Sequence, residues 1–422
     1  MRKWLLVAAV LGACARGTET RYITIGTDAI AAVSALATAD HAKFAVLEVG
    51  AESAIVAIDA GELDALSERM HAQFDRCGGF MLHDSLDDAR AVATRDRRPI
   101  DYTLDRGETV RTVLPALDQG RILATIGELS AMPNRYYQST NGAAASAWLR
   151  DRWRSFSNRA DVTVELVDHG WAQKSVVLTI PGATAPNEIV VLGGHLDSIA
   201  PGGAKSAAPG ADDDASGIAT LTEVARVLLA SDLRPARTIK FIAYAAEEVG
   251  LRGSQAISKA FQQKQLEVVG AIQLDMTNYQ GSDKDIWLMK DFTSAVQNAF
   301  VIQLIETYVG ATWGLDACGY ACSDHASWYR VGVPASMPFE SRMAQRNTSI
   351  HSRNDTLERS GNNAAHALKF ARLAAAYAIE LGKGERGAAT ALAAPAASHG
   401  WRNAAVGLAL AGLALAIRPR RA

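Results

Sequence analysis

An acidic triplet between glycines, Asp212–Asp214 within Gly210–Gly217, constrains the fold of this chain more than any other feature. Asp is a poor helix former, and three adjacent carboxylates repel one another. If the segment folds inward, a positive charge must compensate it, and carboxylate oxygens suit a divalent metal ion. An isolated triplet would more simply be a solvated acidic turn. Here His195 lies upstream and further His, Asp and Glu residues follow, so the pattern predicts a metal centre.

Strand and helix patterns alternate between about residues 118 and 383. Continuous apolar runs predict buried strands at 188–192, 238–244, 269–274 and 286–289. The alternation predicts an α/β domain whose mostly parallel sheet is flanked by helices. In such sheets ligands gather beyond the carboxyl ends of the strands. His195, the pair Glu247–Glu248 and Asp275 all fall at these predicted strand ends.

The residues at these strand ends form the donor set of a zinc site. Zinc binds His nitrogens and carboxylate oxygens, and a catalytic site keeps one position open for water. Two ions that share a carboxylate can be held by His195, one of Asp212–Asp214, one of Glu247–Glu248, Asp275 and a later His. One of the adjacent glutamates can bind metal while the other acts as a general base. Asp197 can accept the other N–H of His195 or simply cap a turn.

Composition and the amino end of the chain indicate a folded, exported protein. The 43 basic and 45 acidic side chains nearly balance, so nothing points to nucleic-acid binding. In residues 1–17, Arg2 and Lys3 precede a short apolar stretch and small residues, which predicts a signal peptide. Leu11–Cys14 also fits a bacterial lipoprotein cleavage box with Cys14 as acceptor, so lipidation is the alternative to ordinary cleavage. The expected location is the periplasm, the cell surface or the medium.

Residues 18–110 are expected to form a small α+β prodomain, since short apolar runs alternate there with acidic, alanine-rich stretches. We expect surface or packing roles for its scattered ligand-type residues, which are His41, His71, Cys77 and His83. A segment between a signal peptide and a catalytic core has the position of a propeptide. It would cover the cleft without disturbing the metals, and the charged stretch 93–106 would suit a processing linker.

The carboxyl end differs in composition from the rest of the chain. Residues 386–403 are an Ala-rich linker, and 404–422 are an apolar run followed by arginines. As a helix, 404–417 would reach about 21 Å, short of a roughly 30 Å hydrocarbon core. The run has no polar face, so it predicts a sorting or anchor tail rather than a helix packed on the domain.

Long motifs carry a family resemblance through the catalytic domain. They are GGHLDS at 193–198, GADDDASG at 210–217, AYAAEEVGLRGS at 243–254, QLDMTNY at 273–279, CGYACSDHASW at 318–328 and IHSRNDT at 350–356. These motifs resemble those of the M28 co-catalytic zinc aminopeptidases. The likeness is greatest to the secreted bacterial leucyl aminopeptidases of the Vibrio type.

The resemblance implies a zinc-peptidase fold over residues 115–385 that binds two Zn²⁺ ions. The implied ligands are His195 and Asp275 for one ion, Glu248 and His351 for the other, and Asp213 as the bridge between them. A hydroxide between the ions would attack the scissile carbonyl, with Glu247 as general base. Asp197 and Asp214 would hold the ligands in position without binding the metals themselves. A cis peptide would join Asp213 to Asp214.

The resemblance also implies an apolar pocket for the first side chain of the substrate. Its lining would be Met276, Met337, Phe339 and Ile350, with Tyr320 near the substrate carbonyl. Cys318 and Cys322 would form a short-loop disulfide around Tyr320. The expected partners are peptides or proteins with a free apolar N-terminus such as Leu, Met or Phe. The enzyme is expected to be a monomer that meets a membrane only through its signal peptide or tail.

Alternatives to this interpretation concern one residue and three functions. His325 looks like a ligand locally, but the family pattern places the metal on His351, so His325 is expected to be structural. A single-zinc glutaminyl cyclase shares the architecture, yet the complete ligand set favours two metals. A carboxypeptidase-like relative would need a basic clamp that the sequence does not reveal. Non-catalytic receptor ectodomains of related fold lose ligands that this chain keeps.

Overall fold

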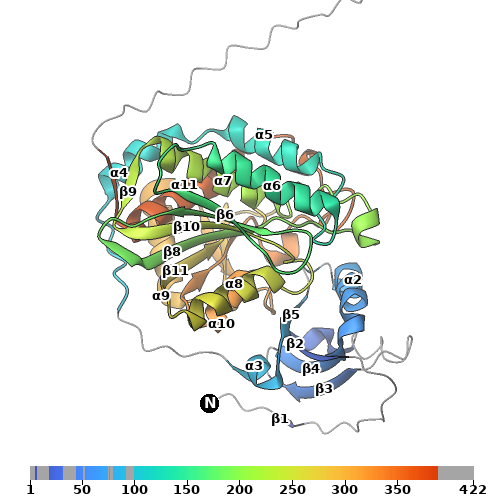
Figure 1. Ribbon diagram of the computed structural model, residues 1–422. Helices are drawn as coiled ribbons and strands as arrows, with labels where there is room; N and C mark the ends of the chain where they lie inside the picture. The colour runs from blue at the N-terminus through green and yellow to red at the C-terminus, as the bar shows by residue number, and fades with distance from the viewer. Residues whose placement is uncertain are drawn as a thin grey trace, which may run out of the picture.

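The structure is a computed structural model that describes residues 5–6, 19–31, 44–50, 53–74, 76, 79–91 and 99–387. A small N-terminal unit lies beside a larger α/β unit (Figure 1). Some sequence predictions lie outside the described residues: most of the signal peptide with Cys14, then His41 and Cys77, most of the processing linker, and the tail 404–422. Among the described helices, none is both long and apolar enough to cross a membrane.

The described residues of the N-terminal unit form an antiparallel sheet of order β1-β3-β4-β2-β5 with helices beside it. Its elements are β1 Leu5–Leu6, β2 Thr20–Gly26, β3 Phe44–Val49, β4 Ser53–Asp59, α2 Leu63–Phe74, β5 Phe80–His83 and α3 Leu86–Arg90. Along α2 the apolar residues Leu63, Leu66 and Met70 recur at helical spacing and are buried with Ile23 and Val56 of the sheet. This face holds α2 on the sheet.

The larger unit is built on a six-stranded sheet of order β14-β11-β8-β10-β7-β6. The strands are β6 Thr163–Val167, β7 Ser175–Ile180, β8 Ala185–His195, β10 Arg237–Tyr244, β11 Glu267–Gln273 and β14 Ala335–Ser336. Neighbours from β14 to β10 are parallel, whereas β10, β7 and β6 pair antiparallel. The sheet is therefore mixed. The expected parallel arrangement describes the four strands that carry the site, and the β6–β7 hairpin was not foreseen.

Helices cover both faces of this sheet (Figure 1). The helices of this unit are α4 Gly107–Val113, α5 Gln119–Ser130, α6 Thr140–Arg154, α7 Ala215–Ala230, α8 Arg252–Gln263, α9 Ala295–Leu304, α10 His325–Arg330 and α11 Ala365–Gly382. Side chains alternate along β8, so Val190 joins the core under α7 and α11, while Val191 joins the core with Trp328 of α10. Burial on both faces explains why the strand is a continuous apolar run.

Shorter elements complete the larger unit. A second sheet has the order β13-β12-β15, and β16 pairs with β9. These strands are β9 Leu233–Pro235, β12 Ile286–Met289, β13 Trp313–Asp316, β15 Pro338–Phe339 and β16 Gly384–Arg386. The single-turn helices of this unit are η3 Leu114–Ala116, η4 Gly203–Lys205, η5 Ile305–Val309, η6 Met343–Gln345 and η7 Leu357–Ser360, while η1 Thr27–Ala29 and η2 Ala60–Glu62 belong to the N-terminal unit.

The segment 99–113 packs on the larger unit. Ile100, Tyr102 and Leu104 lie against its core, and the N–H groups of Asp105 and Arg106 donate to the Glu380 carboxylate at 2.9 and 3.0 Å. By its packing, the N-terminal unit therefore ends before residue 100, earlier than the boundary at 110 that we expected.

The two units are joined by charged contacts. Lys259 Nζ of α8 lies 3.0 Å from Asp84 Oδ2 and 2.7 Å from Asp88 Oδ2. The Arg330 guanidinium donates to the carbonyls of Asp88 and Ala89 at 2.7 and 3.0 Å. These contacts hold the part of the N-terminal unit around α3 against α8 and α10.

Candidate metal centre

The centre lies at the carboxyl ends of the parallel strands. His195 is the last residue of β8 and pairs in register with Tyr244, the last residue of β10. Glu247–Glu248 follow β10 directly, and Asp275 follows β11 by two residues. Parallel neighbours end at one edge of a sheet, which brings these side chains together. The acidic triplet precedes α7, which begins at Ala215.

Asp213 lies between two buried histidines. Its Oδ1 is 2.9 Å from His195 Nε2, and its Oδ2 is 3.0 Å from His351 Nε2. His195 Nε2 is also 3.5 Å from Asp275 Oδ1, while His351 Nε2 is 3.3 Å from Glu248 Oε2. The predicted donor set is thus assembled as two groups that share one carboxylate.

The chemistry of these groups fits divalent zinc. Ligand atoms of His195, Asp213 and Asp275 lie within 4.8 Å of one another, and the same is true of His71, Glu248 and His351. The buried Oδ1 of Asp275 has no hydrogen-bond partner within the described ranges. Imidazole nitrogens and carboxylate oxygens are ordinary zinc ligands, and buried charges of this kind require a cation. The residues therefore fit two zinc ions.

Burial shifts the ionisation of the centre. Desolvation raises the pKa of Asp275 and raises the pKa of Glu247 well above its usual value. Burial lowers the pKa of His195, but the Asp275 and Glu247 carboxylates raise it more, so it lies well above the usual value. Burial opposes ionisation of Asp213, but the hydrogen bonds with His195 and His351 outweigh it, so the pKa of Asp213 lies below its usual value. The groups of the centre therefore shift in opposite directions, and bound cations would favour carboxylates and neutral imidazoles.

Asp197 supports the adjacent glutamates as well as His195. Its Oδ1 accepts the Glu247 N–H at 3.0 Å, and its Oδ2 accepts the Glu248 N–H at 3.1 Å. The same Oδ1 lies 3.5 Å from His195 Nδ1. Of the two roles left open by the sequence, Asp197 combines contact with the histidine and capping of a backbone turn.

Asp214 fixes the start of α7 against the neighbouring strands. Its carboxylate accepts the N–H groups of His195 and Gly217 at 2.9 Å each and that of Met276 at 3.2 Å. The peptide between Asp213 and Asp214 is cis, as the family resemblance implied.

Further buried acids surround the triplet, and the sequence analysis gave them no role. Asp355 accepts the N–H groups of Asp212 and Asp213 at 3.0 to 3.2 Å, so it holds the triplet in place. Burial raises the pKa of Asp355 and Glu340 well above their usual values. The motif IHSRNDT contained Asp355, but only its position in the fold reveals its contacts.

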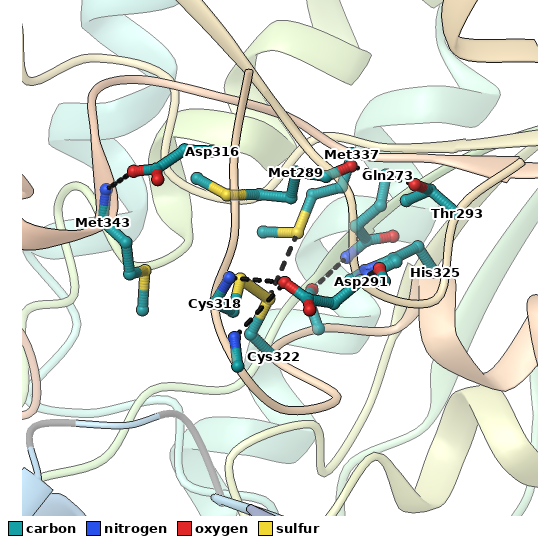
Figure 2. The surroundings of a disulfide bond; sticks show 12 residues. Gln273, Met289, Asp291, Thr293, Asp316, Cys318, Cys322, His325, Met337 and Met343 are labelled. Atoms are coloured by element: carbon teal, nitrogen blue, oxygen red, sulfur yellow. Dashed lines mark hydrogen bonds between the residues drawn. A yellow bond between two sulfur atoms is a disulfide. The ribbon is translucent and has the colours of Figure 1, made fainter. Parts of the chain in front are cut away.

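An apolar pocket lies beside Asp275. Its lining includes the five residues expected from the sequence, which are Met276, Tyr320, Met337, Phe339 and Ile350. The disulfide Cys318–Cys322 forms part of its wall, with Met337 Sδ 3.8 Å from Cys322 Sγ (Figure 2). Asp291 accepts the N–H of Cys318 at 2.5 Å, which anchors the disulfide loop.

His325 is the first residue of α10, which follows this loop, and it belongs to neither metal group. Its Nε2 is 3.1 Å from the Asp291 carbonyl oxygen (Figure 2), and burial lowers its pKa to about 4. A neutral imidazole bonded to the backbone is consistent with the structural role that we expected.

For His71 we expected a surface or packing role. A surface role is wrong, because the side chain is buried. His71 Nε2 lies 3.2 Å from Glu248 Oε2, and the centroids of the His71 and His351 rings are 4.3 Å apart. The sequence did not reveal this position because His71 is far along the chain from the predicted ligands, and only the docking of α2 brings it to the centre. His83, in contrast, is buried within its own unit, 3.0 Å from Thr24 Oγ1.

Comparisons with known proteins agree with this site. Residues 175–377 match the model of a protein family described as "Peptidase family M28". The chain is 33% identical over 321 residues to a "Probable leucine aminopeptidase" of Arthroderma otae, covering 75% of this chain and 88% of that protein. The structure is similar to that of LapB from Legionella pneumophila, with a TM-score of 0.74 at 30% identity, covering 86% of this chain and 100% of that one.

A glutaminyl cyclase of Porphyromonas gingivalis is also similar, at 16% identity with a TM-score of 0.51. The match covers 63% of this chain and 99% of that one, and it shows the fold alone. The finer likeness to Vibrio-type enzymes stays a prediction.

Proposed function

The chain belongs to peptidase family M28 and is a zinc-dependent aminopeptidase, and on that basis we propose that it removes large apolar N-terminal residues from peptides with the help of two zinc ions. The observation that carries this proposal is Asp213, whose two oxygens face two different histidines at 2.9 and 3.0 Å. A carboxylate in that position suits a bridge between two cations.

His195 and Asp275 would hold one ion, Glu248 and His351 the other, with Asp213 shared. Zinc ions bound there would lower the pKa of water and polarise the substrate carbonyl. The protein residues position this chemistry. Asp355 holds the backbone of Asp213, and Asp197 holds the glutamates through their backbone N–H groups.

Glu247 is the proposed proton carrier. It is buried, and neither of its carboxylate oxygens has a hydrogen-bond partner among the described residues. Its carboxylate takes a proton from the attacking water while the water oxygen bonds to the scissile carbonyl carbon. The same proton then passes to the leaving nitrogen as the C–N bond breaks, so the residue ends each cycle unchanged. Tyr320 would donate a hydrogen bond to the developing oxyanion.

The pocket beside Asp275 supports the preference for large apolar first residues. Met276, Met337, Phe339 and Ile350 give it an apolar lining. A Leu, Met or Phe side chain would be desolvated there, which favours binding by roughly 1.5–3 kcal/mol for full burial. Small or charged first residues would gain little.

The N-terminal unit is proposed to be a removable prodomain and the chain to be exported. Supporting evidence is the position of α2, whose His71 reaches the same centre, so the unit covers the proposed cleft. Processing before Ile100 would free the larger unit with the proposed ligands intact. Export rests on the sequence pattern of residues 1–17, and the enzyme is proposed to act as a monomer.

A glutaminyl cyclase is the second candidate. The pair Glu248 and His351 beside the shared Asp213 favours the aminopeptidase, because a single-zinc enzyme does not need a second set of ligands. The cyclase would convert N-terminal Gln to a lactam and release ammonia without cleaving a peptide bond.

A pair of substitutions tests the proposal on the processed protein. Glu247→Gln breaks no hydrogen bond among the described residues, so it should keep two zinc ions but lose about 10²–10⁴ in kcat. Glu248→Gln should instead lose one zinc. Metal analysis and hydrolysis of Leu-p-nitroanilide measure both effects, with N-terminal Gln peptides as the cyclase assay. Wild-type turnover in Glu247→Gln, or cyclisation without hydrolysis, would overturn the proposal.

A further inference from the structure

His71 approaches the centre from the N-terminal unit on the last turn of α2. Its side chain is buried, and Nε2 lies 3.2 Å from Glu248 Oε2. Ser67, one turn earlier on the same helix, donates to the Glu248 carbonyl at 2.9 Å and lies 3.4 Å from His71 Nδ1. Helix α2 is therefore bound to both the backbone and the side chain of one proposed zinc ligand.

The number of ligands decides what such a site can do. A catalytic zinc site has three protein ligands and an open position, whereas a site with four protein ligands is closed to water. Glu248, His351 and the shared Asp213 supply three. His71 presents a fourth ligand-type atom within 4.8 Å of those of Glu248 and His351.

Building on the proposed two-zinc function, we propose that His71 is a zinc ligand in the uncleaved chain, where it completes the second site and keeps the enzyme latent. The N-terminal unit then does more than cover the cleft without disturbing the metals, as we had expected. Removing the unit removes a ligand, and the vacated position becomes available to water or substrate.

Arg76 adds a second block a few residues further along the chain. Its guanidinium lies over the Tyr320 ring, 4.5 Å from the centroid, at the pocket for the first side chain. Asp28 holds that guanidinium through two hydrogen bonds of 2.5 and 3.2 Å. The same stretch of the N-terminal unit thus reaches both the metal centre and the substrate pocket.

The docking of α2 does not depend on the metal. Lys259 with Asp84 and Asp88, and Arg330 with the end of α3, join the units away from the centre. A variant that loses only the imidazole is therefore expected to keep the N-terminal unit in place, so metal binding can be compared at constant architecture.

The test uses the intact, uncleaved chain with His71→Gln, which keeps a polar side chain of similar size but removes the zinc-binding nitrogen. Gln73→Ala is the matched control, since Gln73 lies on the same helix and is exposed. Zinc affinity is measured by competition with a chelator, and the coordination number by the visible absorption of the Co²⁺-loaded protein. We expect the second site of His71→Gln to bind zinc at least about tenfold more weakly and its cobalt bands to change, with Gln73→Ala like wild type.

The same samples separate this inference from the proposed function. An unchanged affinity and cobalt spectrum in His71→Gln would overturn the ligand role of His71, even if the processed enzyme binds two ions and cleaves Leu-p-nitroanilide. A processed enzyme that binds a single ion would overturn the two-zinc function and this inference with it. If His71→Gln is less stable, the cobalt spectrum of its folded fraction still reports the ligand.

Discussion

Replacing Asp197 with Asn tests how the centre is held together. The carboxylate is buried, and each of its oxygens accepts one backbone N–H, from Glu247 and from Glu248. Asn offers one acceptor oxygen in the same shape, so one of these N–H groups must face an NH₂ group instead. The substitution therefore removes one bond and the charge while leaving the volume unchanged.

The size of the effect follows from that geometry. A hydrogen bond to a charged group contributes about 1.5–3 kcal/mol, and leaving a buried donor unsatisfied costs about 1–3 kcal/mol. The two ranges count part of the same loss, so their full sum would be too large. We therefore expect the free energy of unfolding to fall by about 3 kcal/mol. Because Glu248 and His195 both lose support, zinc affinity should fall about 10–100-fold.

Urea unfolding in the presence of chelator measures the first quantity, and chelator competition on the folded protein measures the second. Asp283→Asn is the control, because Asp283 is 71% exposed and its nearest ion pair, to Arg342, spans 4.0 Å. It should change the unfolding free energy by no more than about 0.5 kcal/mol. Zinc affinity of Asp197→Asn within twofold of wild type would refute the reasoning, because Asp197 would then be a turn residue with no influence on the metals.

Two further predictions concern a buried histidine and the apolar pocket. Burial lowers the pKa of His83 to about 4. As the pH falls below about 6.5, the unfolded chain therefore binds a proton at His83 before the folded chain does. The free energy of unfolding of the N-terminal unit should be full above about pH 6.5 and fall by up to about 3 kcal/mol towards pH 4. Urea unfolding at pH 7 and 5 checks this, and a slope as steep in His83→Gln as in the wild type would contradict it. Met276→Trp should fill the apolar pocket. We expect it to lower kcat/KM at least about tenfold for Leu-p-nitroanilide and by less for Ala-p-nitroanilide. Equal losses for the two substrates would show that the pocket lined by Met276 does not bind the first side chain.

The strand-end ligands could be predicted because each comes just after a buried strand. The apolar runs within β8, β10 and β11 are visible in the sequence, and parallel pairing places the residues at their carboxyl ends along one edge of the sheet. His351 has no such signal. It lies in a loop between β15 and α11, and only the family motif identified it.

The features that escaped prediction depend on contacts between distant segments. The edge strand β6 is short and mostly exposed, so its sequence did not reveal an antiparallel hairpin. In the sequence, His71 is one of several scattered histidines. It reaches the centre only because charged residues of α8 and α10 bind the N-terminal unit. Asp355 acquires its role through backbone N–H groups, which a sequence does not display.

The packing of residues 100–106 decides where a shortened chain would begin. Asp105 and Arg106 are held by Glu380 near the end of α11, and Arg237, the first residue of β10, donates to the neighbouring Leu381 carbonyl at 2.7 Å. The proposed centre lies beyond the opposite end of β10, about 25 Å away for its eight residues at about 3.3 Å each. An aminopeptidase processed before residue 100 would thus keep its new N-terminus bound at the end of the sheet opposite its own centre. The centre of the same molecule could not reach that N-terminus, and another molecule could trim it only after the segment had been released from α11.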